Sequence, residues 1–131
     1  MSEIMVAEWI AKAEQDYQAA VTLVRKRKQP VPDVVCFHCQ QCAEKYLKAF
    51  LVRSKVFFPK IHDLLELKRL CVSVDPDFEL IGDWLDHLNP YATEFRYPGE
   101  GATVNESREA VTIMKKVRRF VRAKLGLPSK E

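Results

Sequence analysis

The chain has 131 residues, a length typical of one domain with a buried core, and it is 47% hydrophobic and 30% charged. Its net charge of +3 is mild, so an acidic partner such as a nucleotide or RNA is permitted but not required. No apolar run approaches the roughly 20 residues that a membrane-spanning helix needs, and the first residues show no signal-peptide pattern. We therefore expect a cytoplasmic protein whose thiols are reduced.

Apolar residues recur at helical spacing from the start of the chain. They step by three and four residues along one stripe, which predicts a first helix over residues 3–27. Pro30 and Pro32 forbid its continuation. A second helix is expected from Pro32-Asp33 to about Ser54, because a proline and an acidic residue favour the first turn of a helix.

Shorter apolar stripes follow in the second half of the chain. His62-Asp63 opens a predicted helix over residues 62–71. A further helix is predicted over residues 77–89, which NPYATEF continues with a kink at Pro90 and YPGEG ends. The inward positions of these two helices are Leu64, Leu67, Leu70, Cys71, Phe78, Ile81, Leu85 and Leu88. The last helix is predicted over residues 106–125, where Thr103 and Glu106 have the spacing of a capping box.

The pattern as a whole is helical. No segment alternates as a strand does, and no glycine-rich phosphate loop is present. The sequence therefore predicts a single all-α domain over residues 1–131, with its core at about residues 5–125. We expect an antiparallel up-and-down four-helix bundle with an additional short helix.

Cysteines are concentrated in the stretch CFHCQQC, residues 36–42. On a helical wheel Cys39 and Cys42 lie in the apolar core sector of the second helix, and Cys36 lies on its flank. A metal site would need the sulfurs to converge, whereas a straight helix spreads them along about 9 Å of its axis. We interpret these thiols as buried apolar groups. The alternatives are metal or redox chemistry with Cys71, and an exposed regulatory Cys36.

Polar residues gather on the side of the second helix away from the cysteines, and they are Gln41, Glu44, Lys45 and Lys48. Glu44 and Lys48 are four residues apart in the favourable order, which is worth about 0.3–0.5 kcal/mol on an exposed helix. The structural interpretation is a solvated helix face. The functional one is a polar cleft shared with His62-Asp63, although Asp63 also suits an ordinary helix start.

Three motifs occur along the chain in a specific order. They are CFHCQQCAEKYLKAFLV in the second helix, HDL at residues 62–64, and RYP at residues 96–98, before the last helix. In this order the chain resembles the HEPN domain (higher eukaryotes and prokaryotes nucleotide-binding) over about residues 5–125. The resemblance implies a bundle of four or five helices, commonly a homodimer. Prokaryotic members are often encoded beside a minimal nucleotidyltransferase, as a two-component or toxin–antitoxin pair.

The chain departs from one motif of that family. Many HEPN proteins are ribonucleases whose catalytic motif is an arginine followed four to six residues later by a histidine, completed across a dimer. Arg96 is followed by Tyr97-Pro98-Gly99-Glu100-Gly101-Ala102, and all three histidines precede it. Without that histidine, no group at this place can move a proton near neutral pH. We expect no catalytic residues, no cofactor and no metal.

The resemblance implies a non-catalytic nucleotide- or nucleic-acid-binding module that acts with a partner such as the nucleotidyltransferase. Its candidate binding residues are Gln41, Glu44, Lys45, Lys48, His62, Asp63, Arg96 and Tyr97. Arg96 would give bidentate hydrogen bonds to a phosphate, and Gln41 would pair with a base edge or a ribose hydroxyl. The alternatives are a ribonuclease toxin that uses Arg96 and His62, a structural dimer without a ligand, and an Arg96–Glu44 ion pair that only locks the bundle.

Surface composition gives two further expectations. Basic clusters at residues 25–28 and 115–124 lie near helix ends, where cations are favoured, and at opposite ends of the bundle, so they do not form one nucleic-acid stripe. The apolar surface of the second helix extends beyond its core sector to Phe37, Leu47, Leu51 and Val52. So wide a surface predicts a second contact and hence a two-fold symmetric homodimer.

Overall fold

The computed structural model describes residues 2–93 and 97–128. The regular elements within these ranges are all helical, which confirms the predicted all-α class for the described part of the chain. The α-helices are α1 (Ser2–Leu23), α2 (Pro32–Arg53), α3 (Leu64–Val74), α4 (Gly82–Leu88) and α5 (Val104–Lys124), and the 3-10 helices are η1 (Pro76–Ile81) and η2 (Asn89–Ala92).

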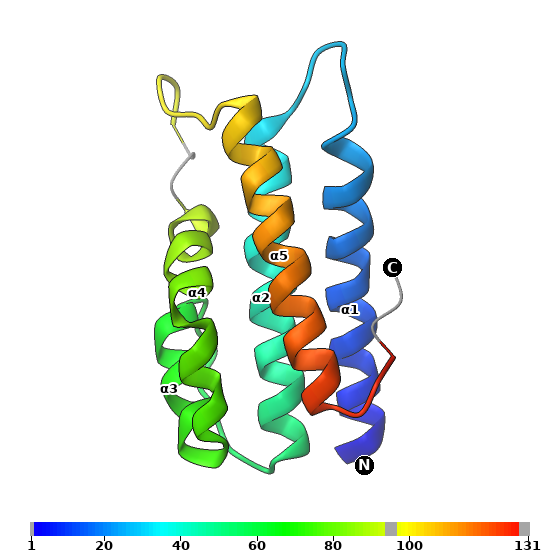
Figure 1. Cartoon of the computed structure of the whole chain (residues 1–131), viewed down its shortest axis with the longest axis vertical. Coiled ribbons are helices and arrows are strands. Elements are labelled where there is room, and N and C mark those ends of the chain that lie inside the picture. The colour runs from blue at the N-terminus through cyan, green and yellow to red at the C-terminus, as the bar shows by residue number, and fades with distance from the viewer. Residues whose placement is uncertain (1, 94–96, 129–131) are drawn as a thin grey trace.

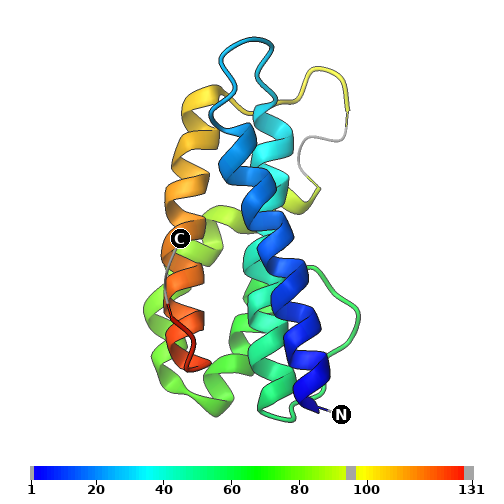
Figure 2. The same cartoon turned by 90° about the vertical axis from the view of Figure 1, so that its right-hand side faces the viewer.

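The long helices stand side by side along the long axis of the molecule (Figure 1). α1 runs antiparallel to α2, and α5 lies against α2. The shorter α3 and α4 pack on the side of α2 and α5 that lies away from α1 (Figure 1, Figure 2). The connector between α2 and α3 rises beside the lower half of α2, so α3 begins partway up the molecule (Figure 2).

α2 is the central element, because it packs on α1, α3, α4, α5 and η2. Leu47 and Leu51, which we placed outside the core sector, are fully buried within one chain, while Phe37 is 41% exposed and Val52 is half-buried. Leu47 and Leu51 therefore give no argument for a homodimer, because neighbours in the same chain cover them, whereas Phe37 remains exposed.

The core contains most of the predicted inward positions of the second half of the chain. Leu64, Leu67, Cys71, Phe78, Ile81, Leu85 and Leu88 are each at most 1% exposed, whereas Leu70 is half-buried. Phe78 joins three elements, because its ring centroid lies 4.5 Å from that of Phe50 and 5.1 Å from that of Phe120. Such tilted and edge-on aromatic contacts add to the energy of apolar burial.

Several helix ends follow the predicted signals. α2 covers Pro32–Arg53, and α5 begins with the predicted capping box, in which the Thr103 hydroxyl accepts from the Glu106 amide and the Glu106 carboxylate accepts from the Thr103 amide. Asp63 caps α3 by accepting a hydrogen bond of 2.9 Å from the backbone amide of Leu65. Its ordinary role as a helix cap is therefore confirmed.

Other boundaries differ from the prediction. α1 ends at Leu23, so the basic run 25–28 lies in the connector and not in a helical turn; Lys26 Nζ instead donates to the carbonyl of Lys28 at 2.8 Å. Like charges three residues apart, as at Arg25 and Lys28, do not favour a further helical turn. α3 continues to Val74, three residues beyond the predicted end.

The predicted helix over residues 77–89 is divided into η1 and α4. Asp75 accepts a hydrogen bond from the amide of Asp77 and starts a tight 3-10 turn at Pro76. Gly82, a weak helix former, stands at the junction where the α-helical geometry begins.

Candidate functional site

A buried carboxylate organises the polar residues between α2 and the start of α3. Glu44 is only 2% exposed. Its oxygens accept hydrogen bonds from Lys48 Nζ at 3.0 Å and from His62 Nδ1 at 3.0 and 3.1 Å. Gln40 and Gln41 approach the same carboxylate with their side-chain amides at 3.3 Å. Burial of this charge is tolerated because several donors compensate for the lost water.

The imidazole of His62 projects from this cluster into solvent. Its side chain is 69% exposed, while that of its partner Glu44 is 3% exposed. The backbone carbonyl of His62 accepts a hydrogen bond of 2.9 Å from Gln40, which fixes the connector against α2. Because Nδ1 faces the carboxylate, Nε2 is the ring nitrogen that faces outward, and it has no partner among the described residues.

A second carboxylate cluster joins α1 to α2. Asp16 is 7% exposed and accepts hydrogen bonds from His38 Nδ1 at 2.7 Å and from Lys45 Nζ at 2.6 Å. The side chain of His38 is 27% exposed, and its ring meets that of Phe37 edge-on, with centroids 5.7 Å apart. The sequence did not identify Asp16 and His38 as site residues. The available signal for Asp16 was its position directly before Tyr17, a core residue of the first helix.

The structure brings together only part of the predicted residue set. Gln41, Glu44, Lys48 and His62 lie in one cluster, and Asp63 caps the adjoining helix. Lys45 belongs instead to the Asp16 cluster on the α1 side. The solvated face expected for Glu44 and Lys48 is wrong, since Lys48 is also only 5% exposed. Its ammonium lies 5.4 Å from the ring centroid of Trp9, within reach of a cation–π contact.

The connector that carries the RYP motif is fixed at both of its ends. At the α4 side, Asn89 accepts from the amide of Leu64 at 2.8 Å and donates to Asp63 at 3.2 Å. At the α5 side, the amide of Ala102 donates to Asp33 at 2.6 Å, at the start of α2. Tyr97 is 67% exposed, and Arg96 lies outside the described residues, so the predicted Arg96–Glu44 pair lies outside them as well.

The cysteines lie in the core. Cys36, Cys39, Cys42 and Cys71 are free thiols and all are 0% exposed, which confirms their interpretation as buried apolar groups and excludes an exposed Cys36. Burial raises the pKa of the Cys71 thiol to about 12, and burial together with neighbouring groups raises the pKa of Cys39 and Cys42 as well. Within residues 2–93 and 97–128, no three His, Cys, Asp or Glu side chains are grouped to hold a metal ion.

The basic residues of α5 are largely engaged inside the fold. Arg118 is 5% exposed and donates hydrogen bonds to the Glu14 carboxylate from Nε at 2.7 Å and from an Nη at 2.9 Å. Arg122 donates to the hydroxyl of Tyr46 at 2.9 Å. Lys124 pairs with Asp75 and Asp77 at 2.8 and 2.6 Å. These cations hold α5 to its neighbours. The basic run 25–28 and the cluster 115–124 lie toward opposite ends of the molecule, as expected (Figure 1).

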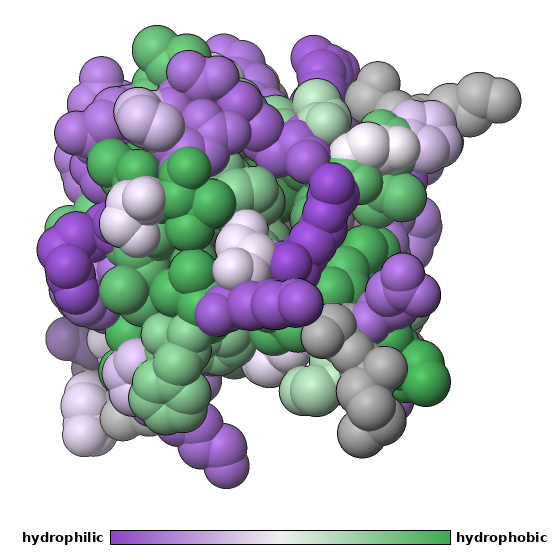
Figure 3. Space-filling model, turned by 90° about the horizontal axis from the view of Figure 1, so that it is seen from below, coloured by the Kyte–Doolittle hydropathy of each residue, from purple (hydrophilic) through white to green (hydrophobic). Residues whose placement is uncertain are grey.

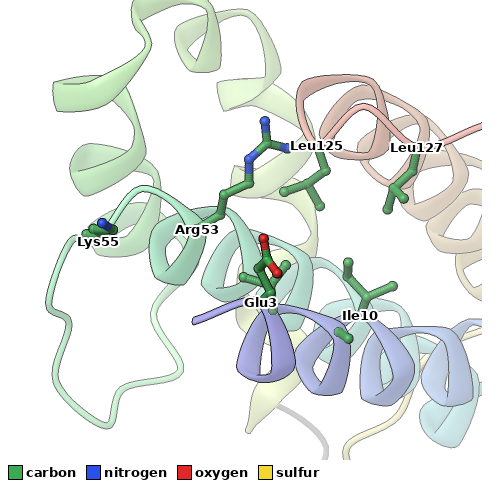
Figure 4. A pocket seen from close by; sticks show the side chains of 8 residues that line it. Glu3, Ile10, Arg53, Lys55, Leu125 and Leu127 are labelled. Atoms are coloured by element: carbon green, nitrogen blue, oxygen red, sulfur yellow. The ribbon is translucent and has the colours of Figure 1, made fainter. Parts of the chain in front are cut away.

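A hollow of about 610 Å³ lies away from these clusters, at the lower end of the molecule. Ile10, Leu125 and Leu127 provide apolar walls, and Glu3, Arg53 and Lys55 provide charges (Figure 4). Seen from this end, apolar side chains alternate with hydrophilic ones across the surface (Figure 3). None of the predicted site residues lines this hollow.

The sequence matches a known family over most of its length. The family model for the HEPN domain matches residues 6–125. The chain belongs to the HEPN domain family. No curated protein and no solved structure was found to match it. Among the described helices, none is both long enough and apolar enough to cross a membrane.

Proposed function

We propose that this HEPN domain binds RNA or a nucleotide through the outward side of α2 and the start of α3, without catalysis of its own. The observation that supports this is the exposed imidazole of His62 held by the buried carboxylate of Glu44 at 3.0 Å. An anchored side chain loses little conformational freedom when it binds a ligand, so its contact is more favourable than that of a mobile surface group.

The other predicted residues have different parts in this proposal. Gln41 offers an amide that can reach a base edge or a ribose hydroxyl. Arg96 and Tyr97, on the connector between η2 and α5, supply a phosphate contact and an aromatic contact. Lys45 and Lys48 neutralise Asp16 and Glu44, so that these two buried carboxylates do not repel an anionic ligand.

We also propose the assembly that is common in the HEPN family. The domain forms a homodimer, and it acts with a minimal nucleotidyltransferase as a toxin–antitoxin-like pair. In the family arrangement, α1, α2, the η1–α4–η2 segment and α5 correspond to the four bundle helices, and α3 is the additional short helix.

Binding is tested by titration of the purified protein. We expect a fluorescently labelled single-stranded RNA octamer to bind, and the affinity to fall about tenfold in His62→Gln and in Arg96→Ala while the melting temperature is retained. Calorimetry with ATP and GTP tests the mononucleotide form of the ligand. His87→Gln is the histidine control, because His87 lies on α4 and makes no contact with Glu44 or Asp16; its Nε2 lies 3.6 Å from a Glu109 oxygen without a hydrogen bond. Equal affinities in wild type, His62→Gln and Arg96→Ala would remove the support for this site.

A ribonuclease is the second candidate, and the His62–Glu44 pair is the observation that favours it. A carboxylate bound to Nδ1 orients an imidazole so that Nε2 can accept the proton of a ribose 2′-hydroxyl. We nevertheless expect RNA to stay intact during long incubation with the purified domain, since the family histidine after Arg96 is absent. Cleavage that is lost in both His62→Gln and Arg96→Ala would replace the binding proposal with this one.

A further inference from the structure

The two carboxylate clusters of α2 have the same composition. Each consists of a carboxylate, a lysine and a histidine, and in each the histidine donates through Nδ1. In the first, Asp16 binds His38 and Lys45 at 2.7 and 2.6 Å. In the second, Glu44 binds His62 and Lys48, both at 3.0 Å. Both clusters include residues of α2, and packing alone does not require them, because buried charges cost free energy that apolar residues would not.

In each cluster the lysine balances the charge of the carboxylate, so the buried carboxylate does not repel an anion that approaches the imidazole from outside. His38 Nε2 has no partner among the described residues, and it is not one of the buried side-chain atoms without a partner. It therefore reaches solvent, as the outer nitrogen of the more exposed His62 does.

The two imidazoles lie on either side of one polar and aromatic strip. On a helical wheel, Gln41 and Phe37 lie between His38 and Glu44, the residue that holds His62. Glu44 lies six positions after His38, which corresponds to about 9 Å along the axis of α2. Phe37 is 41% exposed and forms a T-shaped pair with His38, so a substantial part of its side chain is accessible to a planar group.

We propose that His38, held by Asp16, is a second phosphate contact of this surface and that Phe37 stacks a base, so that the ligand is single-stranded RNA. Two separated imidazoles suit successive phosphates of a chain better than the single phosphate cluster of a free nucleotide. An open aromatic ring requires an unpaired base, which a duplex does not offer. The inference rests on the proposed function and defines its ligand class.

The test compares single-stranded and double-stranded RNA octamers by fluorescence anisotropy. We expect wild type to prefer the single strand, and His38→Gln and Phe37→Leu each to weaken its binding about tenfold. The double variant His38→Gln/His62→Gln should lose about a hundredfold, because separated contacts contribute additively to the free energy. His87→Gln is again the control. Phe37→Leu changes an exposed side chain and keeps the test valid if His38→Gln is unstable.

The outcomes of this test distinguish failure of the inference from failure of the proposed function on which it rests. Wild-type binding that is weakened by His62→Gln but unchanged by His38→Gln and Phe37→Leu overturns the inference alone. No binding of single-stranded RNA by wild type overturns the proposed RNA-binding function and the inference with it. A change in the association state of Phe37→Leu with unchanged RNA affinity assigns this face to a second copy of the chain, and this also overturns the inference.

Discussion

At the scale of single residues, an ion pair joins α1 to α5. Glu14 accepts two hydrogen bonds from the guanidinium of Arg118 and one from the hydroxyl of Tyr46. Burial raises the pKa of Glu14, but the hydrogen bonds from Arg118 and Tyr46 and the charges of Arg118 and Arg122 outweigh it, so the pKa lies below its usual value. The pair therefore stabilises the folded state with Glu14 ionised.

Replacement of Glu14 should destabilise the fold in a pH-dependent way. Glu14→Gln leaves the nearly buried Arg118 without a counter-charge, and we expect the free energy of unfolding at pH 7 to fall by about 2–4 kcal/mol. Because the folded pKa is depressed, this contribution is complete above about pH 4.3, the usual glutamate value, and disappears as the pH falls through the folded pKa. Urea unfolding of both proteins between pH 7 and 3 measures the difference. A constant difference at every pH would contradict the assigned charge state.

Residue-scale prediction from the sequence was incomplete for a physical reason. Helical spacing placed Gln41, Glu44 and Lys48 on one side of α2, and the structure brings them together with His62. Spacing cannot show what covers that side, so the burial of Glu44 and Lys48 was not predicted. Asp16 and His38 come from helices far apart in the sequence, and only the packing of α1 on α2 brings them together.

At the scale of elements, the end of α2 places a lysine in a backbone conformation that favours glycine. The backbone forms a Schellman motif, in which the amides of Lys55 and Val56 bond the carbonyls of Val52 and Leu51 at 3.0 and 2.9 Å. The motif places Lys55 in the left-handed region, with φ of 60°. Glycine adopts this conformation without the steric cost that a side chain incurs.

We therefore expect Lys55→Gly to raise the free energy of unfolding by about 0.5–1 kcal/mol. Lys60→Gly is the control, since Lys60 is an exposed connector residue without a positive φ, and it should be neutral or slightly destabilising. Thermal unfolding of the three proteins distinguishes the effects. A Lys55→Gly protein no more stable than Lys60→Gly would contradict the argument from backbone strain.

The positions of the helices were predicted better than their type, α or 3-10. Apolar periodicity and the signals at Pro32 and Thr103 identified α2 and α5 almost to the residue. The pattern from Asp77 to Asn89 gave the correct buried side chains but not the 3-10 geometry of η1, because positions three apart share a face in both kinds of helix. The end of α1 depended on the connector conformation, which apolar spacing does not encode.

At the scale of the whole molecule, an apolar surface remains on the outer side of α1. Met5 is 48% exposed and lies one turn before Trp9, whose ring contacts that of Phe58 with centroids 6.2 Å apart. Phe57, next to Phe58 in the sequence, is 88% exposed. Exposed apolar side chains of this kind are typical of protein interfaces, where their burial supplies much of the binding energy.

This surface, and not the apolar side of α2, is where we expect the proposed homodimer to form. Light scattering at micromolar concentration should give about twice the chain mass of 15.2 kDa for wild type. Phe57→Glu should shift it to the monomer, because a charge in an apolar contact is costly to bury without a partner. Leu80→Glu changes a side chain that is 75% exposed on η1, away from α1, and should leave the dimer intact. A monomeric wild type would contradict the homodimer itself, whereas a dimer that tolerates Phe57→Glu would place the contact on another face.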